Sequence, residues 1–365
     1  MALMAAERLK VVRREAIRAL TAFAIALVVA FLIILATSDT PRETFTTLLT
    51  GPMSSKRTIG LWIDDVAKLT VTGLAFSLVF QARQFALGVQ GQVYVGGLFA
   101  AFVALSPIGQ TWLGMPLATL AAMAAGAFYG FIPGYAKAKL GANEIVSSLM
   151  LNYIAVNLVT YMIRVPLAAG QGLMSTPNFP SYVVFPALVA RTRIDIGLIL
   201  AIVAVIAVWF ALYRTSWGLK LRLVGHNPRF AEHSGIRAGF IMVSAMTASG
   251  ALGGLLGAMF VQGQAFGKLG VLFEGNLAFE GILIAIVAKT RPIAVPVVAL
   301  FYGYLRQGAA IMGIRTDVPT EVISVVQAVI ILLVASSFSL DGRKWIARLI
   351  PSSKSSNAAA AEVRE

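Results

Sequence analysis

The sequence has no cysteine and only two histidines among its 365 residues. Disulfides and thiolate metal sites are therefore excluded, and little is left for metal binding or nucleophilic chemistry. Charge is also scarce. Asp, Glu, Lys and Arg make up 13% of the chain, about half the share of a typical soluble domain. The apolar residues, 58% of the total, form long blocks and give a mean hydropathy of +0.82. These features place the chain among membrane proteins.

No enzymatic constellation is evident. The nearest approach to a phosphate-binding loop is QGQAFGKL, which lacks the first glycine and the final hydroxyl of G-x-x-x-x-G-K-[ST]. A membrane-embedded enzyme would need a clustered catalytic set, and none is present. No series of Asp, Glu and His crosses the apolar blocks in the way that a proton relay requires. We therefore expect no catalytic residue, no bound metal and no ATPase site on this chain.

The net charge of +14 comes from 30 Lys and Arg against 16 Asp and Glu. In a soluble protein this excess would suggest nucleic acid, but cytoplasmic loops of helical membrane proteins also gather Lys and Arg. Nucleic acid is therefore not an expected partner, whereas membrane lipid is. The basic segment 1–18 precedes an apolar run, Ala19–Ala36. That run exceeds the ~7–15 residues of a signal-peptide core. It predicts a retained first transmembrane helix rather than a cleaved signal peptide.

Apolar segments recur along residues 19–338, the predicted transmembrane domain. A spanning helix needs about 20 mostly apolar residues. The candidates are 19–37, 69–82, 92–108, 115–136, 145–163, 196–213, 238–261, 279–288, 292–310 and 319–338. Short segments such as 69–82 and 279–288 are typical of broken or partly unwound helices beside a cavity. We predict an all-α polytopic membrane protein with about ten transmembrane helices, some of them broken or short.

The distribution of basic residues sets the predicted topology. Of the 30 Lys and Arg residues, 20 fall on the side of the N-terminus and 10 on the other. This bias predicts that both termini are cytoplasmic. The outer side then holds the long loops 38–68 and 164–195, expected to contain short helices. The cytoplasm holds the loop 214–237 and the low-complexity tail 339–365, which is expected to be disordered.

Glycines occur at a spacing typical of helix packing in lipid. Gly126, Gly130 and Gly134 form two successive G-x-x-x-G steps, and Gly250 with Gly254 forms another. Small residues at this spacing let helix backbones approach closely. The pattern fits both an interface that slides during a conformational cycle and one that packs statically.

Polar side chains within the predicted spans are candidates for a translocation pathway. They are Gln90, Gln92, Asn152, Asn157 and Glu280. Such groups are unfavourable in lipid and usually face a cavity or another helix. For Gln90 and Gln92, pore lining and structural hydrogen bonding are both open. Glu280 is compatible with a proton-carrying role or with simple solvation near the end of its span.

Both histidines lie in one polar cassette, RLVGHNPRFAEHSGI, between two apolar stretches. A metal site, a solvated loop and a docking element are the alternatives. Asn227 is a good N-cap, Pro228 suits the first helical position, and Gly235 can end the helix. This helix would begin after His226 and contain His233, so a metal site would need ligands from elsewhere. The cassette predicts a short capped helix outside the membrane.

The cassette pattern G-x-N-x-x-x-A-x-x-x-G-I resembles the cytoplasmic loop of ABC-importer permeases of the ribose, branched-chain amino acid and nucleoside group. KLGANEIVSSLMLNYIA, with Asn143 as a plausible N-cap before Glu144, is similar to a signature of the nucleoside (simple sugar)-type permeases. FALGVQGQVYVGG looks like the F-N-I-G-x-E-G-Q segment, but has Ala86 and Gln90 where Asn and Glu are common. FEGILIAIVAKTRPIAVPVVALFYGYLRQGA is similar to a late pair of spans. The resemblance covers roughly residues 60–338.

The resemblance implies that the cassette holds a coupling helix that docks on an ATP-binding subunit. The residues concerned are Gly225, Asn227, Pro228, Arg229, Ala231, Glu232 and Gly235. It further implies a multi-pass permease subunit in a bacterial-type inner membrane. The expected partners are P-loop ATPase subunits that use ATP-Mg, a second and often different permease, and an extracytoplasmic solute-binding protein. The expected cargo is a small polar solute, a nucleoside or simple sugar, moved by alternating access.

Two alternatives differ in class from an ATP-driven importer. One is a secondary transporter driven by an ion gradient, which is based on Glu280 and the two short spans. The other is a structural membrane scaffold, which the polar groups within the spans argue against.

Overall fold

The computed structural model describes residues 25, 27–170, 174–271, 277–316, 318, 325 and 328. The chain divides into two compact units. One consists of Met1–Ala36 with Ser324–Glu365, and the other is Thr37–Ile323. In the first unit, the described residues belong mainly to a short apolar helix, Leu27–Thr37. The predicted segments 1–18 and 339–365 lie outside the described residues, as does nearly all of the predicted span 319–338.

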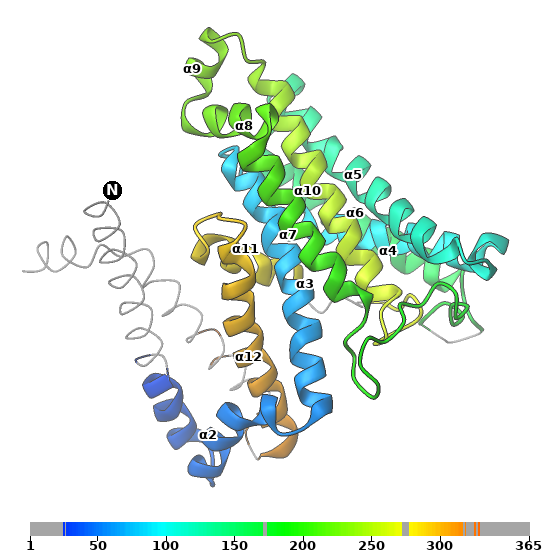
Figure 1. Cartoon of the computed structure of the whole chain (residues 1–365), viewed down its shortest axis with the longest axis vertical. Helices are drawn as coiled ribbons and strands as arrows, with labels where there is room; N and C mark the ends of the chain where they lie inside the picture. The colour runs from blue at the N-terminus through cyan, green and yellow to red at the C-terminus, as the bar shows by residue number, and fades with distance from the viewer. Residues whose placement is uncertain are drawn as a thin grey trace, which may run out of the picture. The chain divides into compact units, whose positions relative to one another are not determined.

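The regular elements in the described residues of the second unit are all helices (Figure 1). In chain order its helices are α2 (Pro41–Thr50), η1 (Gly51–Met53), α3 (Lys56–Gln81), α4 (Val89–Leu105), η2 (Pro107–Gln110), α5 (Gly114–Leu140), α6 (Glu144–Arg164), α7 (Ile196–Arg214), α8 (Ser216–His226), α9 (Pro228–His233), α10 (Ala238–Val261), α11 (Leu277–Val287) and α12 (Ala294–Arg315). Extended pairing in the described part of the chain is limited to two isolated bridges. The predicted all-α class is confirmed.

Five of these helices, α5, α6, α7, α10 and α12, are long and apolar enough to cross a membrane. The helices α4 and α11 are apolar but shorter. The predicted spans 145–163, 196–213 and 238–261 agree closely with α6, α7 and α10. An all-α polytopic membrane protein is therefore confirmed, whereas the number of ten spans and the side of the termini remain predictions.

Helix α3 is much longer than the predicted span 69–82. It begins after Ser55, whose hydroxyl accepts the N–H of Thr58 at 3.2 Å. The charged residues in its first half led to the prediction of a loop that extends to residue 68. In the structure Lys68 pairs with Asp64 one turn away, Nζ to Oδ2 at 2.7 Å. Local pairing lets charge lie within the helix, so the predicted loop 38–68 instead contains α2, η1 and the first half of α3.

The short helix α11 lies beside α3, as the yellow and blue ribbons of Figure 1 show. Gly281 packs directly against Thr72. At the end of α3, the Gln81 amide donates to the carbonyl of Thr290 at 3.1 Å. Helix α12 then returns along α3, and Trp62 donates to the carbonyl of Leu300 at 3.0 Å. The predicted short helix at 279–288 is thus a partner of α3.

The predicted packing glycines lie in one contact between α5 and α10. A Cβ placed at Gly126 would lie 2.6 Å from the backbone nitrogen of Gly254, and one at Gly130 would lie 2.5 Å from the carbonyl oxygen of Met246. Gly250 meets the carbonyl of Gly126, and Gly134 packs on Met246. The two backbones therefore touch without intervening side chains, which is the arrangement that this spacing permits.

We expect Gly254→Ala to destabilise the protein, because the new methyl group would overlap Ala122 and lie 2.9 Å from the Cα of Met123. Overpacking of this kind costs about 1–3 kcal/mol. Gly239→Ala is the matched control in the same helix, since its methyl group would meet only ordinary contacts, at 3.5 Å from Ala138. Thermal unfolding in detergent, followed by tryptophan fluorescence, should show a lower Tm for Gly254→Ala only. Equal Tm values would contradict the tight interface.

The α8–α9 cassette and the α2–η1 region lie at opposite ends of α3 (Figure 1). The start of α3 contacts η1, whereas the carbonyl of Gln81 at its end meets Gly225 of α8. A helix of 26 residues is about 39 Å long, enough to cross a membrane. The α8–α9 cassette is thus separated from the α2–η1 region by the full length of α3.

Candidate functional site

The cassette forms the capped helix that its sequence predicts. The side chain of Asn227 accepts the N–H of Phe230 at 3.2 Å, and Pro228 occupies the first position of α9. The helix ends at His233, and Gly235 follows with φ of +78°, a conformation that favours glycine. These capping predictions are confirmed. His226 ends α8 and lies outside α9, also as predicted.

The cassette rests on the ends of the spanning helices. Helix α8 starts at the N-cap Thr215, whose hydroxyl accepts the N–H of Gly218 at 3.2 Å. The indole of Trp217 donates to Ser244 of α10 at 2.8 Å. Any side chain at Gly225 would overlap the carbonyl oxygen of Gln81. Backbone therefore meets backbone where α8 contacts the end of α3.

One face of α9 points away from this support. Ala231 is fully buried, whereas Arg229, Glu232 and His233 are exposed. Phe230 lies among them with 58% of its surface exposed. Phe230 is not among the residues predicted from the sequence. The available signal was a lone aromatic residue in a polar, capped helix outside the apolar spans.

Asn152, a predicted pathway residue, instead supports the start of α4. Its Oδ1 accepts the N–H of Gly91 at 2.8 Å, and its Nδ2 donates to the carbonyl of Leu87 at 2.7 Å. Ser148, one turn earlier in α6, accepts the N–H of Leu87 at 2.9 Å. Two α6 side chains thus satisfy the irregular backbone between α3 and α4. Asn152 is a positioning residue in this conformation.

We expect Asn152→Ala to lower stability, because it leaves the Gly91 N–H and the Leu87 carbonyl without their partner. Each unsatisfied buried group costs about 1–3 kcal/mol. Asn157→Ala, in the same helix, should change stability by no more than about 0.5 kcal/mol, because substitutions of exposed residues usually have effects of this size or smaller. Comparison of the two Tm values measures the difference. A larger loss for Asn157→Ala would refute the assignment.

The other predicted pathway residues do not converge on one site. Gln90 is half-buried in the first turn of α4. Gln92 is 5% exposed and packs against Gly253 of α10, where a Cβ would lie 2.8 Å from its Oε1. Asn157 is exposed on α6 and donates to the carbonyl of Tyr153 at 2.8 Å. The four amides therefore occupy three environments: a helix start, the α4–α10 contact and an outward face.

Glu280 belongs to a cluster of three charges that joins α3, α11 and α12. The Nε of Arg306 lies 3.1 Å from Oε2 of Glu280, and its Nη1 lies 2.9 Å from Oδ2 of Asp65. The three side chains are only 19–24% exposed. Glu280 is therefore paired rather than simply solvated. Asp65 was not singled out from the sequence, because its partner is 241 residues away.

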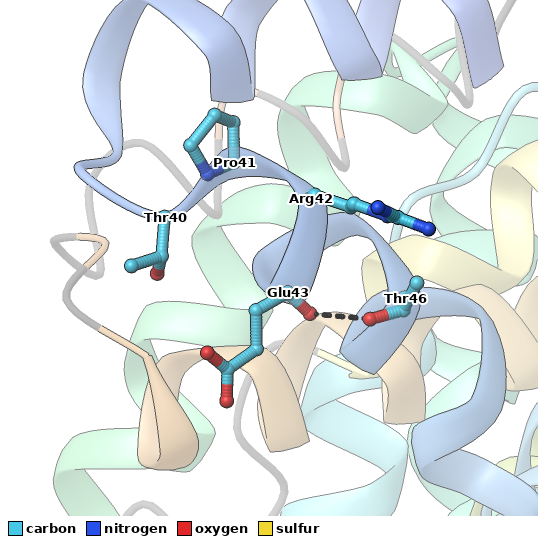
Figure 2. A pocket seen from close by; sticks show the side chains of 5 residues that line it. All are labelled: Thr40, Pro41, Arg42, Glu43 and Thr46. Atoms are coloured by element: carbon cyan, nitrogen blue, oxygen red, sulfur yellow. Dashed lines mark hydrogen bonds between the residues drawn. The ribbon is translucent and has the colours of Figure 1, made fainter.

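A shallow pocket lies at the first turn of α2, and Figure 2 shows its lining residues. Its volume is about 440 Å³, and it is bounded by Thr40, Pro41, Arg42, Glu43 and Thr46. The hydroxyl of Thr46 donates to the carbonyl of Glu43 at 2.8 Å. No residue predicted to line the pathway takes part in it. Among the described residues, no group of three or more His, Asp or Glu side chains could hold a metal ion.

The described residues form a bundle of long apolar helices with a capped cassette at one end of α3, an architecture that fits an integral membrane protein. The family described as branched-chain amino acid transport system / permease component matches residues 59–335, and the chain belongs to it. Its relatives are permease subunits of ABC transporters, which are not enzymes themselves.

Three relatives illustrate the similarity. The guanosine ABC transporter permease protein NupP of Bacillus subtilis is 31% identical over 325 residues, 88% of this chain and 93% of that protein. The nucleoside ABC transporter permease protein NupB of Lactococcus lactis is 30% identical over 332 residues, 87% and 91% of the two chains. The glucose ABC transporter permease protein TsgB13 of Haloferax volcanii is 29% identical over 291 residues, 76% of each chain. No solved structure matches the chain significantly.

Proposed function

We propose that this permease moves a small, uncharged polar solute, a nucleoside or a simple sugar, in an ATP-driven importer of the inner membrane. The observation that carries the proposal is the capped α9 helix, which is exposed on one face and seated on the spanning helices on the other. The named cargoes of the relatives, guanosine, nucleosides and glucose, support the solute class. These cargoes are neutral and rich in hydrogen-bonding groups, which suit amide side chains.

Helix α9 is the proposed docking element for a P-loop ATPase that binds ATP-Mg. Interface energy is commonly concentrated in aromatic and arginine side chains, and α9 presents Phe230 beside Arg229. Asn227 keeps the short helix formed, and Gly225 seats the cassette on Gln81. A displacement of α9 by the ATPase would therefore reach the end of α3, and ATP would bias the permease between inward- and outward-facing states.

A second permease is the proposed partner within the membrane. Two permeases of Bacillus subtilis, NupP and NupQ, match this chain, as do NupB and NupC of Lactococcus lactis. Two outward faces of the bundle differ in character. On α7, Ile202 and Ile206 are exposed in a span without amides. On α6, Asn157 lies between exposed Tyr153 and Tyr161.

Amide and phenol groups avoid lipid tails, so they usually face protein or a water-filled cavity. We therefore assign the α7 face to lipid and the α6 face to the solute pathway beside the second permease. At the opposite end of α3 from the cassette, the outer loops would receive the solute from an extracytoplasmic binding protein.

The proposal is tested by uptake into proteoliposomes that contain the chain with its ATPase and second permease. Labelled guanosine, uridine and glucose are supplied through the cognate binding protein. We expect uptake of at least one solute that requires ATP and is unaffected by a protonophore. Uptake without ATP that collapses with the protonophore would establish the secondary transporter instead.

A further inference from the structure

Five buried side chains have atoms without hydrogen-bond partners in the described structure; Gln84, Gln92 and Ser249 are three of them, and Ser77 and Glu280 are the others. Both amide atoms of Gln84, Oε1 of Gln92 and Oγ of Ser249 are in this condition. The three residues are only 1%, 5% and 1% exposed, respectively. Buried polar groups in native proteins are nearly always paired, with ordered water where protein partners are lacking. Each of these groups therefore calls for a partner that the described residues do not supply.

Gln84 points inward from the linker between α3 and α4. Residues 84–87 lack helical structure, and exposure alternates along them, with Gln84 and Ala86 buried and Phe85 exposed. Ala86 packs in one cluster with Val79 of α3 and Met246 of α10. Because alternate residues of an extended segment share a side, Gln84 faces the same helices as Ala86.

The other two side chains continue this line along α10. Ser249 follows Met246 by three residues and precedes Gly253 by four, which places the three on neighbouring turns of one helix face. Gly253 is where Gln92 of α4 packs, since a Cβ there would lie 2.7 Å from the Cβ of Gln92. These neighbours place Gln84, Gln92 and Ser249 along the contact of the linker and α4 with α10, and we call the three side chains the polar seam.

The polar seam adjoins the contact that supports the cassette. Gln81, whose carbonyl meets Gly225 of α8, precedes Gln84 by three residues. The far end of the same linker is held by Asn152 of α6. A displacement of α8 therefore acts on a linker that is fixed at its other end, and the seam lies along that linker.

We propose that the polar seam is an internal site for water, closed in this conformation and hydrated when α4 and α10 separate during the transport cycle. Water supplies both donors and acceptors, so it can satisfy the amide atoms and the hydroxyl together. The link to the transport cycle rests on the proposed function, whereas the uptake of water by the seam does not.

The absence of cysteine gives a direct test, because a single introduced thiol is the only reactive one in the chain. Ser249→Cys is nearly isosteric, and a thiolate reacts with a small charged methanethiosulfonate only where water reaches it. In open membrane vesicles that contain the full chain, we expect Ser249→Cys to be labelled at least tenfold faster than Ala258→Cys. Both residues belong to α10, and both are at most 1% exposed.

Equal slow labelling of the two variants would overturn the seam as a water site. The measurement uses neither solute nor ATPase, so it can fail while transport stands, and the reverse also holds. In the assembled transporter, we expect the labelling rate of Ser249→Cys to differ at least threefold between the nucleotide-free and ATP-bound states. An unchanged rate would overturn the link between the seam and the cycle.

Discussion

Phe230→Ala is expected to abolish most ATP-dependent uptake while leaving the permease folded. Phe230 is 58% exposed on α9, so its removal takes little from the core. Loss of an aromatic anchor from an interface typically costs 2 kcal/mol or more, a factor of about 30 or more in affinity. The affinity of the detergent-solubilised permease for its ATPase, measured by biolayer interferometry, and uptake in proteoliposomes should therefore fall together.

Phe240 provides a matched control for this experiment. It lies near the start of α10, close in sequence to the cassette, and is 68% exposed. It belongs to a spanning helix rather than to α9, so Phe240→Ala should leave the ATPase affinity unchanged. Similar losses for the two variants, or full affinity for Phe230→Ala, would show that α9 is not the docking element.

Local sequence codes account for the parts of the site that could be predicted. The signals for α9 are local: Asn227 caps the helix, a proline follows it, and Gly235 ends the turn after the helix. Because they lie within a few residues of one another, they can be recognised from the sequence without tertiary structure. The same applies to Asn143, which accepts the N–H of Ile145 at 2.9 Å as the N-cap of α6. The glycine spacing likewise predicted a close helix contact, because glycines four residues apart lie on the same face of a helix and let another backbone approach it.

Tertiary contacts determine the parts that could not be predicted. An asparagine within a span fits a pathway as well as a structural hydrogen bond, and only the fold shows that Asn152 supports backbone groups more than 60 residues away. The exposure of Phe230 depends on how α9 sits on its neighbours. The docking and pathway roles remain proposals, since they depend on partners and on other conformations.

The start of α3 shows the same limit. Charges at positions 64, 65 and 68 interrupt its apolar pattern, and an unpaired charge in a span is unfavourable. The pairing that makes these charges acceptable comes partly from the next turn and partly from α12. Hydropathy therefore placed the helix start about a dozen residues late, and the charge cluster that lies on α3 was not recognised.

Arg306→Gln is expected to destabilise the protein strongly. It would leave Asp65 and Glu280 without their shared cation, between helices that pack closely. Removing one partner of a fully buried ion pair costs about 3–5 kcal/mol, because the remaining charge is uncompensated. The side chains of this cluster are 19–24% exposed, so water offsets part of that cost and the low end of this range is expected. We expect a marked loss of monodisperse protein after extraction, measured by size-exclusion chromatography, and a lower Tm in the fraction that survives.

Two further variants separate this mechanism from a general effect of losing an arginine. Arg315→Gln removes an exposed arginine at the end of the same helix and should be nearly neutral. The triple variant Asp65→Asn, Glu280→Gln, Arg306→Gln removes all three charges. Replacement of a complete buried cluster is often tolerated, so it should recover much of the lost stability. If the triple variant is as unstable as Arg306→Gln alone, packing of the arginine stem rather than charge pairing holds α11 and α12 against α3.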